Sequence, residues 1–259
     1  MRIALIVEYE GTRYSGFQYQ ANAPSIQEEL EKSITLLTNE HTRISAAGRT
    51  DAGVHALAQV VSFETSVDYP LTTFVKGLNH HLQKDIAVKA AYRTEDNFDP
   101  RRMALSRMYK YTISCSSTPS PLNRRTTYHF GAPLDVRRTR AAARHFVGKH
   151  NFAKFAGPLQ RPHANTIREI YKAPVRQMGD IINFEVEGNA FLPHQVRRMA
   201  GALIDVGRGA LDPADLKSMV DTTSRDLVAN TLPPEGLCLV GVTYADFPPK
   251  VGETDDDDN

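Results

Sequence analysis

Cysteine and long apolar stretches are scarce in this sequence. The 259 residues include only Cys115 and Cys238, which lie too far apart for a metal-binding or redox motif. We therefore expect two free thiols in the reducing cytoplasm. No apolar run approaches the roughly 20 residues of a membrane helix, so the sequence predicts no membrane span. The apolar start, residues 1–7, is too short for a signal peptide and predicts a strand.

Histidines at metal-binding spacings are also absent. His80 and His81 are adjacent, whereas a helical metal site needs histidines four residues apart on one face. His41 and His55 add no ligand spacing. The sequence therefore predicts no metal site.

The net charge of +1 hides an uneven distribution of charge. Residues 101–150 contain 11 Lys and Arg but one acidic residue, whereas residues 209–259 contain 3 basic and 11 acidic residues. The basic segment also contains aromatic residues, a mixture that suits phosphates and stacked bases. We favour RNA binding for this segment over a merely solvated basic helix face. The acidic run 255–258 predicts a disordered tail over residues 251–259.

The spacing of apolar residues predicts a mixed α+β fold. Alternation predicts strands over residues 2–9, 57–64, 85–92, 107–113, 166–175, 180–187 and 237–242. Helical spacing predicts helices over residues 25–38, 71–82, 136–147, 193–203 and 212–220. Because the elements lack a regular βα repeat, we predict helices packed on a largely antiparallel sheet.

A glycine-punctuated loop at residues 46–56 carries the strongest chemical pattern. Its two glycines, five residues apart, permit turns that a Cβ would obstruct. Between them lie Arg49, Thr50 and Asp51, which supply a cation, a hydroxyl and a carboxylate. An aspartate beside a glycine often only caps a turn, and that is the simpler interpretation of a short match. The match here, GRTDAGVHA, covers nine residues and resembles the catalytic-aspartate motif of the TruA family of tRNA pseudouridine synthases.

Other stretches resemble motifs of the same family, so the resemblance covers nearly the whole chain. They are YEGTRYSGFQYQ near the start, the R-x-Y-x-Y pattern that includes Tyr109, FLPHQVRR around Arg197, and PPEGLCLVGV near the C-terminus. The chain departs from the family pattern at Asn151, which replaces an aspartate in the HDFxxF motif. It departs again at His194-Gln195 and at Arg198 within the FLxxMVRN motif.

The resemblance implies a fold and a function. The fold would be two related α/β halves of ferredoxin-like type that share one sheet, with the active-site cleft between them. We place the halves at residues 1–105 and 106–250. The function would be isomerisation of uridine to pseudouridine in the anticodon stem-loop of tRNA, around positions 38–40. The resemblance also implies a homodimer that needs no cofactor.

The resemblance further implies the site residues. Asp51 would be the nucleophile, Arg197 its partner, and Tyr109 the contact to the target uridine. Arg197 also lies beside an apolar helix face, where an unpaired guanidinium is costly, so it calls for an acidic partner. The remaining expected RNA contacts are Arg49, His55, Phe98, Arg101, Arg102, Arg107, Lys110, Arg161 and Arg168.

Two other functions remain open at this stage. A non-catalytic RNA-binding protein of the same fold needs no aspartate–arginine pair, so a large separation between Asp51 and Arg197 would favour it. A different enzyme with a carboxylate nucleophile, such as a glycosidase, normally has a second carboxylate near the first. No motif in the sequence supplies that second carboxylate. Whether Asp51 attacks ribose C1′ or base C6 is also left open.

Overall fold

The computed structural model describes residues 1–159, 164–221 and 230–248. The predicted RNA contact Arg161 and the predicted tail at 251–259 lie outside these described residues. The helices of the described part are α1 (Ile26–Thr38), α2 (Leu71–His81), α3 (Val136–Ala143), α4 (Gln195–Gly207) and α5 (Pro213–Asp221). The strands are β1 (Arg2–Tyr9), β2 (Ser45–Ala46), β3 (His55–Glu64), β4 (Ile86–Thr94), β5 (Ser106–Ser114), β6 (Tyr128–His129), β7 (Gly148–Asn151), β8 (Ile167–Lys172), β9 (Val175–Met178), β10 (Ile181–Gly188) and β11 (Leu237–Thr243).

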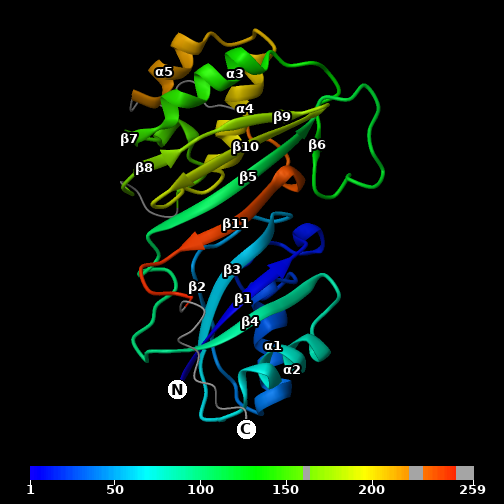
Figure 1. The fold of residues 1–259 in the computed structure, drawn as a ribbon, viewed down its shortest axis with the longest axis vertical. Helices are drawn as coiled ribbons and strands as arrows, with labels where there is room; N and C mark the ends of the chain where they lie inside the picture. Colours follow the sequence, from blue (N-terminus) through cyan, green and yellow to red (C-terminus); the bar gives the residue numbers. More distant parts are fainter. Residues whose placement is uncertain (160–163, 222–229, 249–259) are drawn as a thin grey trace.

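One sheet runs through the whole molecule in the order β4-β1-β3-β11-β5-β10-β8-β7. Neighbours along this order are antiparallel, except that β3 and β11 are parallel. Figure 1 shows β1, β3 and β4 with helices α1 and α2 in one part of the molecule, and β5 to β10 with α3, α4 and α5 in the other. The prediction of helices packed on a largely antiparallel sheet is confirmed.

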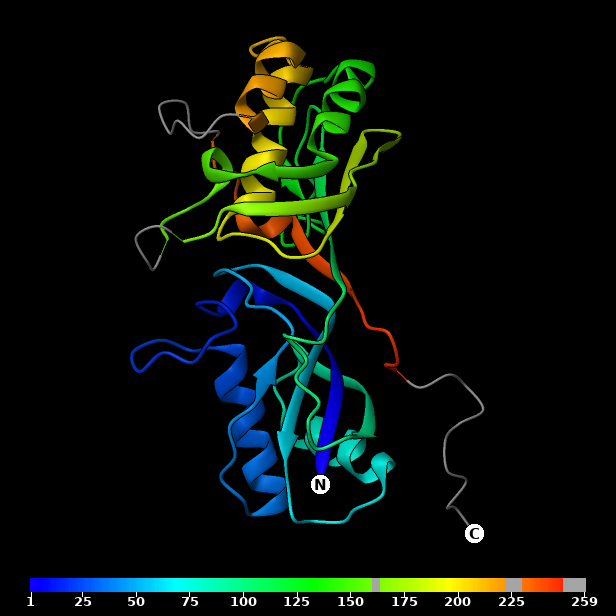
Figure 2. The ribbon, with the colours of Figure 1, turned by 90° about the vertical axis from the view of Figure 1, so that its left-hand side faces the viewer.

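Strand β11 joins the two parts of the sheet. It follows the other described strands in the chain, yet it lies between β3 and β5. Cys238 pairs with His55 of β3 on one side and with Lys110 of β5 on the other. In Figure 2 the two parts lie one above the other, and β11 passes from one to the other.

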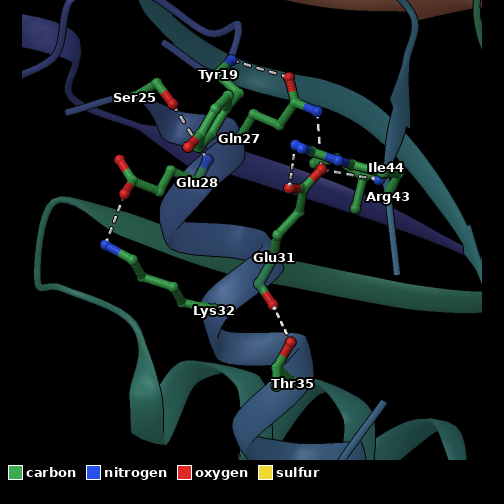
Figure 3. A network of polar contacts seen from close by, with 9 residues as sticks. All are labelled: Tyr19, Ser25, Gln27, Glu28, Glu31, Lys32, Thr35, Arg43 and Ile44. Carbon is green, nitrogen blue, oxygen red and sulfur yellow. Dashed lines mark hydrogen bonds and ion pairs between the residues drawn. The ribbon is translucent and has the colours of Figure 1, made fainter. Parts of the chain in front are cut away.

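Helix α1 holds the segment just before β2 through hydrogen bonds. Ser25 caps its N-terminus, and the Ser25 hydroxyl accepts the backbone N–H of Glu28. The network in Figure 3 centres on Glu31, whose carboxylate accepts from the Ile44 N–H at 3.1 Å and from Arg43 at 2.9 Å. Because Ile44 immediately precedes β2, these bonds fix the start of β2 on α1.

Three predicted elements differ from the structure: one strand is divided, and two helices have different ends. The strand predicted over 166–175 is divided into β8 and β9, and the break contains Pro174, which has no N–H for the sheet. The helix predicted over 136–147 ends at Ala143 and continues as a short 3-10 turn. Helix α4 begins at Gln195 rather than Pro193, because His194 has a left-handed backbone that interrupts the helix.

No helix in residues 1–159, 164–221 or 230–248 is long and apolar enough to cross a membrane. No three potential metal ligands of the His, Cys, Asp or Glu type lie together in those same ranges. Cys115 and Cys238 are free thiols, as predicted.

Candidate active site

Asp51 lies on the loop between β2 and β3, and backbone hydrogen bonds hold that loop in place. The Thr50 carbonyl accepts the N–H of Phe17 at 3.0 Å, and Gly53 donates its N–H to the Tyr14 carbonyl at 3.2 Å. Gly53 has a φ of +77°, in the left-handed region that glycine adopts without steric cost. The glycine therefore serves the turn that presents Asp51.

A buried polar network supports the same loop from the core. The Tyr9 hydroxyl lies 2.8 Å from the Thr50 hydroxyl, and the Gln59 amide donates to the Gly48 carbonyl at 2.9 Å. Burial raises the pKa of Tyr9 far above its usual range, so its hydroxyl stays neutral. Because buried polar groups need partners, this network fixes the depth of the loop above the sheet.

Arg197 approaches Asp51 from the other part of the molecule. It lies in the first turn of α4, and its Nη1 is 3.4 Å from Oδ2 of Asp51. Its Nε donates to the Leu232 carbonyl at 2.7 Å, which orients the guanidinium. The side chains of Arg197 and Asp51 are only 14% and 28% exposed, so solvent screens this ion pair less than a surface pair.

A cleft of about 830 Å³ contains Asp51. One wall comes from the β2–β3 loop and the other from residues 190–196, which lead into α4. Among the described residues that line the cleft, Asp51 is the one acidic side chain, whereas four are arginines: Arg49, Arg101, Arg107 and Arg168. This balance of charge favours a polyanionic ligand.

Tyr109 forms part of the floor of this cleft. It lies on β5, is 8% exposed, and packs edge-to-face on Phe191 with ring centroids 5.2 Å apart. Burial, reinforced by the negative charge of Asp51, raises the pKa of Tyr109 far above its usual range. The phenol therefore keeps its proton at neutral pH.

Arg107 is buried among backbone carbonyl groups. Its guanidinium donates to the carbonyls of Ala47 (2.8 Å), Asn189 (2.8 Å), Ala104 (3.2 Å) and Arg101. Ala47 is the first residue of the loop that carries Asp51, and Asn189 follows β10. The Arg107 side chain therefore connects the two walls of the cleft. Burial lowers the pKa of Arg107, but a guanidinium remains charged at neutral pH.

The other predicted RNA contacts fall into two groups. Arg49, Arg101 and Arg168 line the cleft; the first two are exposed, and Arg168 donates to the Asn165 and Ile167 carbonyls.

The second group lies away from the described cleft lining. His55 is buried, and its Nδ1 accepts the N–H of Gly11. Phe98 packs in a small core with Tyr244 and Phe247. Lys110 is on the opposite face of β5 from Tyr109, and exposed Arg102 pairs with Asp99.

His194 is a residue of the cleft that the sequence analysis did not select. Its Nε2 lies 3.8 Å from Oδ2 of Asp51, on the same oxygen that Arg197 approaches. Its φ of +59° is uncommon for a residue other than glycine. The motif around Arg197 does not single out His194, because the sequence shows neither its left-handed backbone nor its proximity to Asp51.

Comparison with known proteins identifies the family. A family model described as tRNA pseudouridine synthase matches residues 5–101 and 142–245. The chain is 43% identical over 250 residues to "tRNA pseudouridine synthase A" of Myxococcus xanthus, covering 96% of this chain and 94% of that protein. It is 41% identical over 244 residues to the protein of the same name from Geobacter sulfurreducens, covering 93% and 99%. The chain belongs to the tRNA pseudouridine synthase family.

This membership confirms the family that the motifs around Asp51 and Arg197 resemble. The tRNA pseudouridine synthases are isomerases that act on uridine in tRNA, so the chain is an enzyme. A large separation between Asp51 and Arg197 would have favoured the non-catalytic alternative, but Nη1 of Arg197 lies 3.4 Å from Oδ2 of Asp51. The glycosidase alternative required a second carboxylate, and Asp51 is the one acid in the described lining of the cleft.

Proposed function

We propose that this tRNA pseudouridine synthase modifies uridines of the anticodon stem-loop, around positions 38–40, and that Asp51 is its nucleophile. The observation that supports Asp51 as the nucleophile is its contact with Arg197 across an otherwise basic cleft. The stem-loop position is supported by the resemblance of the motifs to the TruA family.

Asp51 has the chemistry that this isomerisation needs. The N1–C1′ bond of uridine breaks, and C1′ is rejoined to C5. A carboxylate nucleophile divides such a reaction into two easier steps. Both described contacts of the Asp51 carboxylate reach Oδ2, from Arg197 and His194. Oδ1 is thus the oxygen that we assign to the attack, on either C1′ or C6.

Arg197 supports the nucleophile electrostatically. A nearby positive charge favours the ionised form of a carboxylate, and the low exposure of the pair strengthens this effect. The bond from Arg197 Nε to the Leu232 carbonyl prevents the guanidinium from turning away. Arg197 therefore acts through Asp51 as a positioning residue.

The target uridine must leave its stack to reach Asp51. We assign Tyr109 as the surface on which the extruded ring rests, since its ring lies in the cleft beside Phe191. Exposed Arg49, two residues from Asp51, would fill the space left in the RNA. Arg101 and Arg168 would contact phosphates at the cleft margin.

The remaining parts of the proposal concern organisation and location. We assign two related ferredoxin-like halves at residues 1–105 and 106–250; the family match falls into segments on either side of this boundary. We also assign a homodimer, on the resemblance to the TruA family. The two free thiols support a reducing compartment, the cytoplasm.

The test uses an anticodon stem-loop transcript with tritium at C5 of uridine, because joining C1′ to C5 releases that tritium. We expect release by the wild type and by Asp68→Asn, a matched control whose carboxylate is exposed and pairs with Arg93. We expect none from Asp51→Asn, with tRNA affinity retained. Transcripts with single uridines at positions 38, 39 or 40 locate the target.

Two outcomes would contradict the proposal. Comparable release by Asp51→Asn would remove Asp51 as the nucleophile. No release by the wild type from a stem-loop that it binds would remove the anticodon stem-loop as its substrate.

A further inference from the structure

His194 is held in its place by an unusual backbone and by close packing. Its left-handed conformation immediately precedes α4 and costs conformational free energy that surrounding contacts must offset. A Cβ built on Gly157 would lie 2.9 Å from Nδ1 of His194, so the imidazole packs directly on the Gly157 backbone. Gly157 in turn donates its N–H to the Pro193 carbonyl at 2.7 Å. The ring is therefore fixed between Gly157 and Asp51.

The ring nitrogen nearest Asp51 is available for chemistry. Nε2 of His194 lies 3.8 Å from Oδ2 of Asp51, too far for a hydrogen bond. The side chain of His194 is 33% exposed and lines the cleft. Nε2 is thus near the reacting carboxylate without being committed to it, and water can carry a proton away from the ring.

The reaction requires an acceptor for the proton on C5. On the route in which Asp51 attacks C1′, C5 still carries its hydrogen after it joins C1′, and the ring has a C6=N1 double bond. The C5–H bond must break so that its electron pair re-forms C5=C6. The C6=N1 pair then moves to N1, which takes up a proton. One proton leaves C5 and one arrives at N1, so the step balances without an oxidant or reductant.

Few side chains in the described cleft can accept the proton from C5. The arginines already carry their protons. Tyr109 also keeps its proton, since burial and the charge of Asp51 raise the pKa of its phenol. The Asp51 carboxylate has already left C1′ at this point, but it keeps its contact with Arg197, and a carboxylate is a weaker base than an imidazole. The nucleophilic role of Asp51 belongs to the proposed function, on which this inference rests. An imidazole changes its charge near neutral pH and suits general base catalysis.

We propose that His194 is the general base that removes the proton from C5 of the rearranged uridine, through Nε2. The imidazolium so formed lies beside the carboxylate of Asp51 and the exposed side of the cleft. It returns its proton to water or to N1. This assigns separate residues to the two chemical steps: Asp51 to the exchange of the glycosidic bond and His194 to proton removal.

The first test compares His194→Asn and His194→Gln with the wild type in single turnovers of the full-length enzyme. The substrate is a stem-loop transcript with hydrogen or deuterium at C5. Asparagine tolerates the left-handed backbone, and glutamine extends an amide nitrogen to about the position of Nε2; neither is a base. His81→Asn, on the exposed end of α2, is the matched control.

We expect both His194 variants to form pseudouridine about 10²-fold more slowly or worse, with tRNA affinity unchanged. We expect a primary deuterium isotope effect that the wild type and His81→Asn lack, because proton removal becomes rate-limiting. Asp51→Asn should form no product, with or without deuterium. Its behaviour therefore distinguishes failure of bond exchange from failure of proton removal.

The second test is chemical rescue. Glycine suits the φ of +59°, so His194→Gly should fold and leave a space for a free base. Added imidazole should restore C5 tritium release, and methylimidazoles should do so according to their basicity. A residue that only positioned Asp51 would give no such dependence.

Three results would overturn the assignment. Wild-type rates in both His194→Asn and His194→Gln would remove His194 from the reaction. Slow variants without an isotope effect or rescue would reduce it to a positioning residue. Absence of tritium release by the wild type would remove the proposed function and this inference with it.

Discussion

The two walls of the cleft are built in different ways. The Asp51 wall is held locally: the Phe17 N–H bonds to its backbone, and the Tyr9 and Gln59 side chains support it from the core. The Arg197 wall begins with the left-handed His194 and places its guanidinium by one bond to the Leu232 carbonyl. Asp51 is therefore positioned by its own loop and by the sheet beneath that loop. Arg197 is positioned by a contact with Leu232, which is distant in the sequence.

Among substitutions that separate the two walls, removing Arg197 should have the largest effect on the reaction, because it breaks the contact with Asp51 itself. Arg197→Gln keeps a polar side chain but loses the charge beside Asp51. We expect single-turnover rates to fall about 10²–10³-fold, with a small change in tRNA affinity. The matched control is Arg208→Gln at the far end of the same helix, where the arginine is exposed and pairs with Asp205. Equal losses in both variants would contradict the assigned role of Arg197.

Arg107 tests whether the walls depend on each other for stability. Arg107→Met removes a guanidinium that carbonyls of both walls share. We expect the free energy of unfolding to fall by about 3 kcal/mol, since several buried acceptors lose their donor. Urea denaturation measures the change, and exposed Arg102→Met is the control. Unchanged stability in Arg107→Met would show that water or rearrangement replaces these bonds.

Tyr9→Phe should have a smaller effect, confined to the Asp51 wall. The substitution removes the hydroxyl that meets the Thr50 hydroxyl and leaves the ring in place. We expect a loss of about 1 kcal/mol in the free energy of unfolding and a modest decrease in the single-turnover rate. Tyr69→Phe, at a more exposed tyrosine, is the control. A larger loss of rate than of stability would indicate that the network positions Asp51.

The smallest expected effect concerns Cys238, which lies on β11 between β3 and β5. Burial raises the pKa of this thiol to about 11. The thiolate is the reactive form, so alkylation in a Cys115→Ser background should be slow at pH 8 and accelerate as the pH rises toward that value. The raised pKa also means that this thiol contributes stability below its unfolded pKa, about 8.5, and that this contribution is lost between there and about pH 11. Fast alkylation at pH 8 would indicate that β11 separates from its neighbours.

The sequence predicted the local parts of this site better than the assembled parts. The nine-residue motif singled out Asp51, and helical spacing placed Arg197 in α4 beside an apolar face. Alternation along β5 also indicates that Lys110 and Tyr109 lie on opposite faces, because a strand places successive side chains on opposite faces. The sequence therefore separates Lys110 from the face of β5 that lines the cleft.

Features that depend on distant backbone could not be predicted in this way. The carbonyls around Arg107 come from Ala47, Arg101, Ala104 and Asn189, and no spacing in the sequence indicates that they converge. The role of His194 depends on a single positive φ, which histidine adopts rarely. The sequence therefore indicated which chemistry is present but not how Arg107 and His194 are used.

The place of β11 in the sheet has a consequence for how the protein is made. This strand is synthesised after the other described strands, yet it must enter between β3 and β5. A ribosome-bound chain that lacks residues 237–243 already contains Asp51, His194 and Arg197, but not the strand that pairs with both neighbours. The cleft is therefore completed only after β11 has been synthesised, and we expect the nascent chain to be inactive until then.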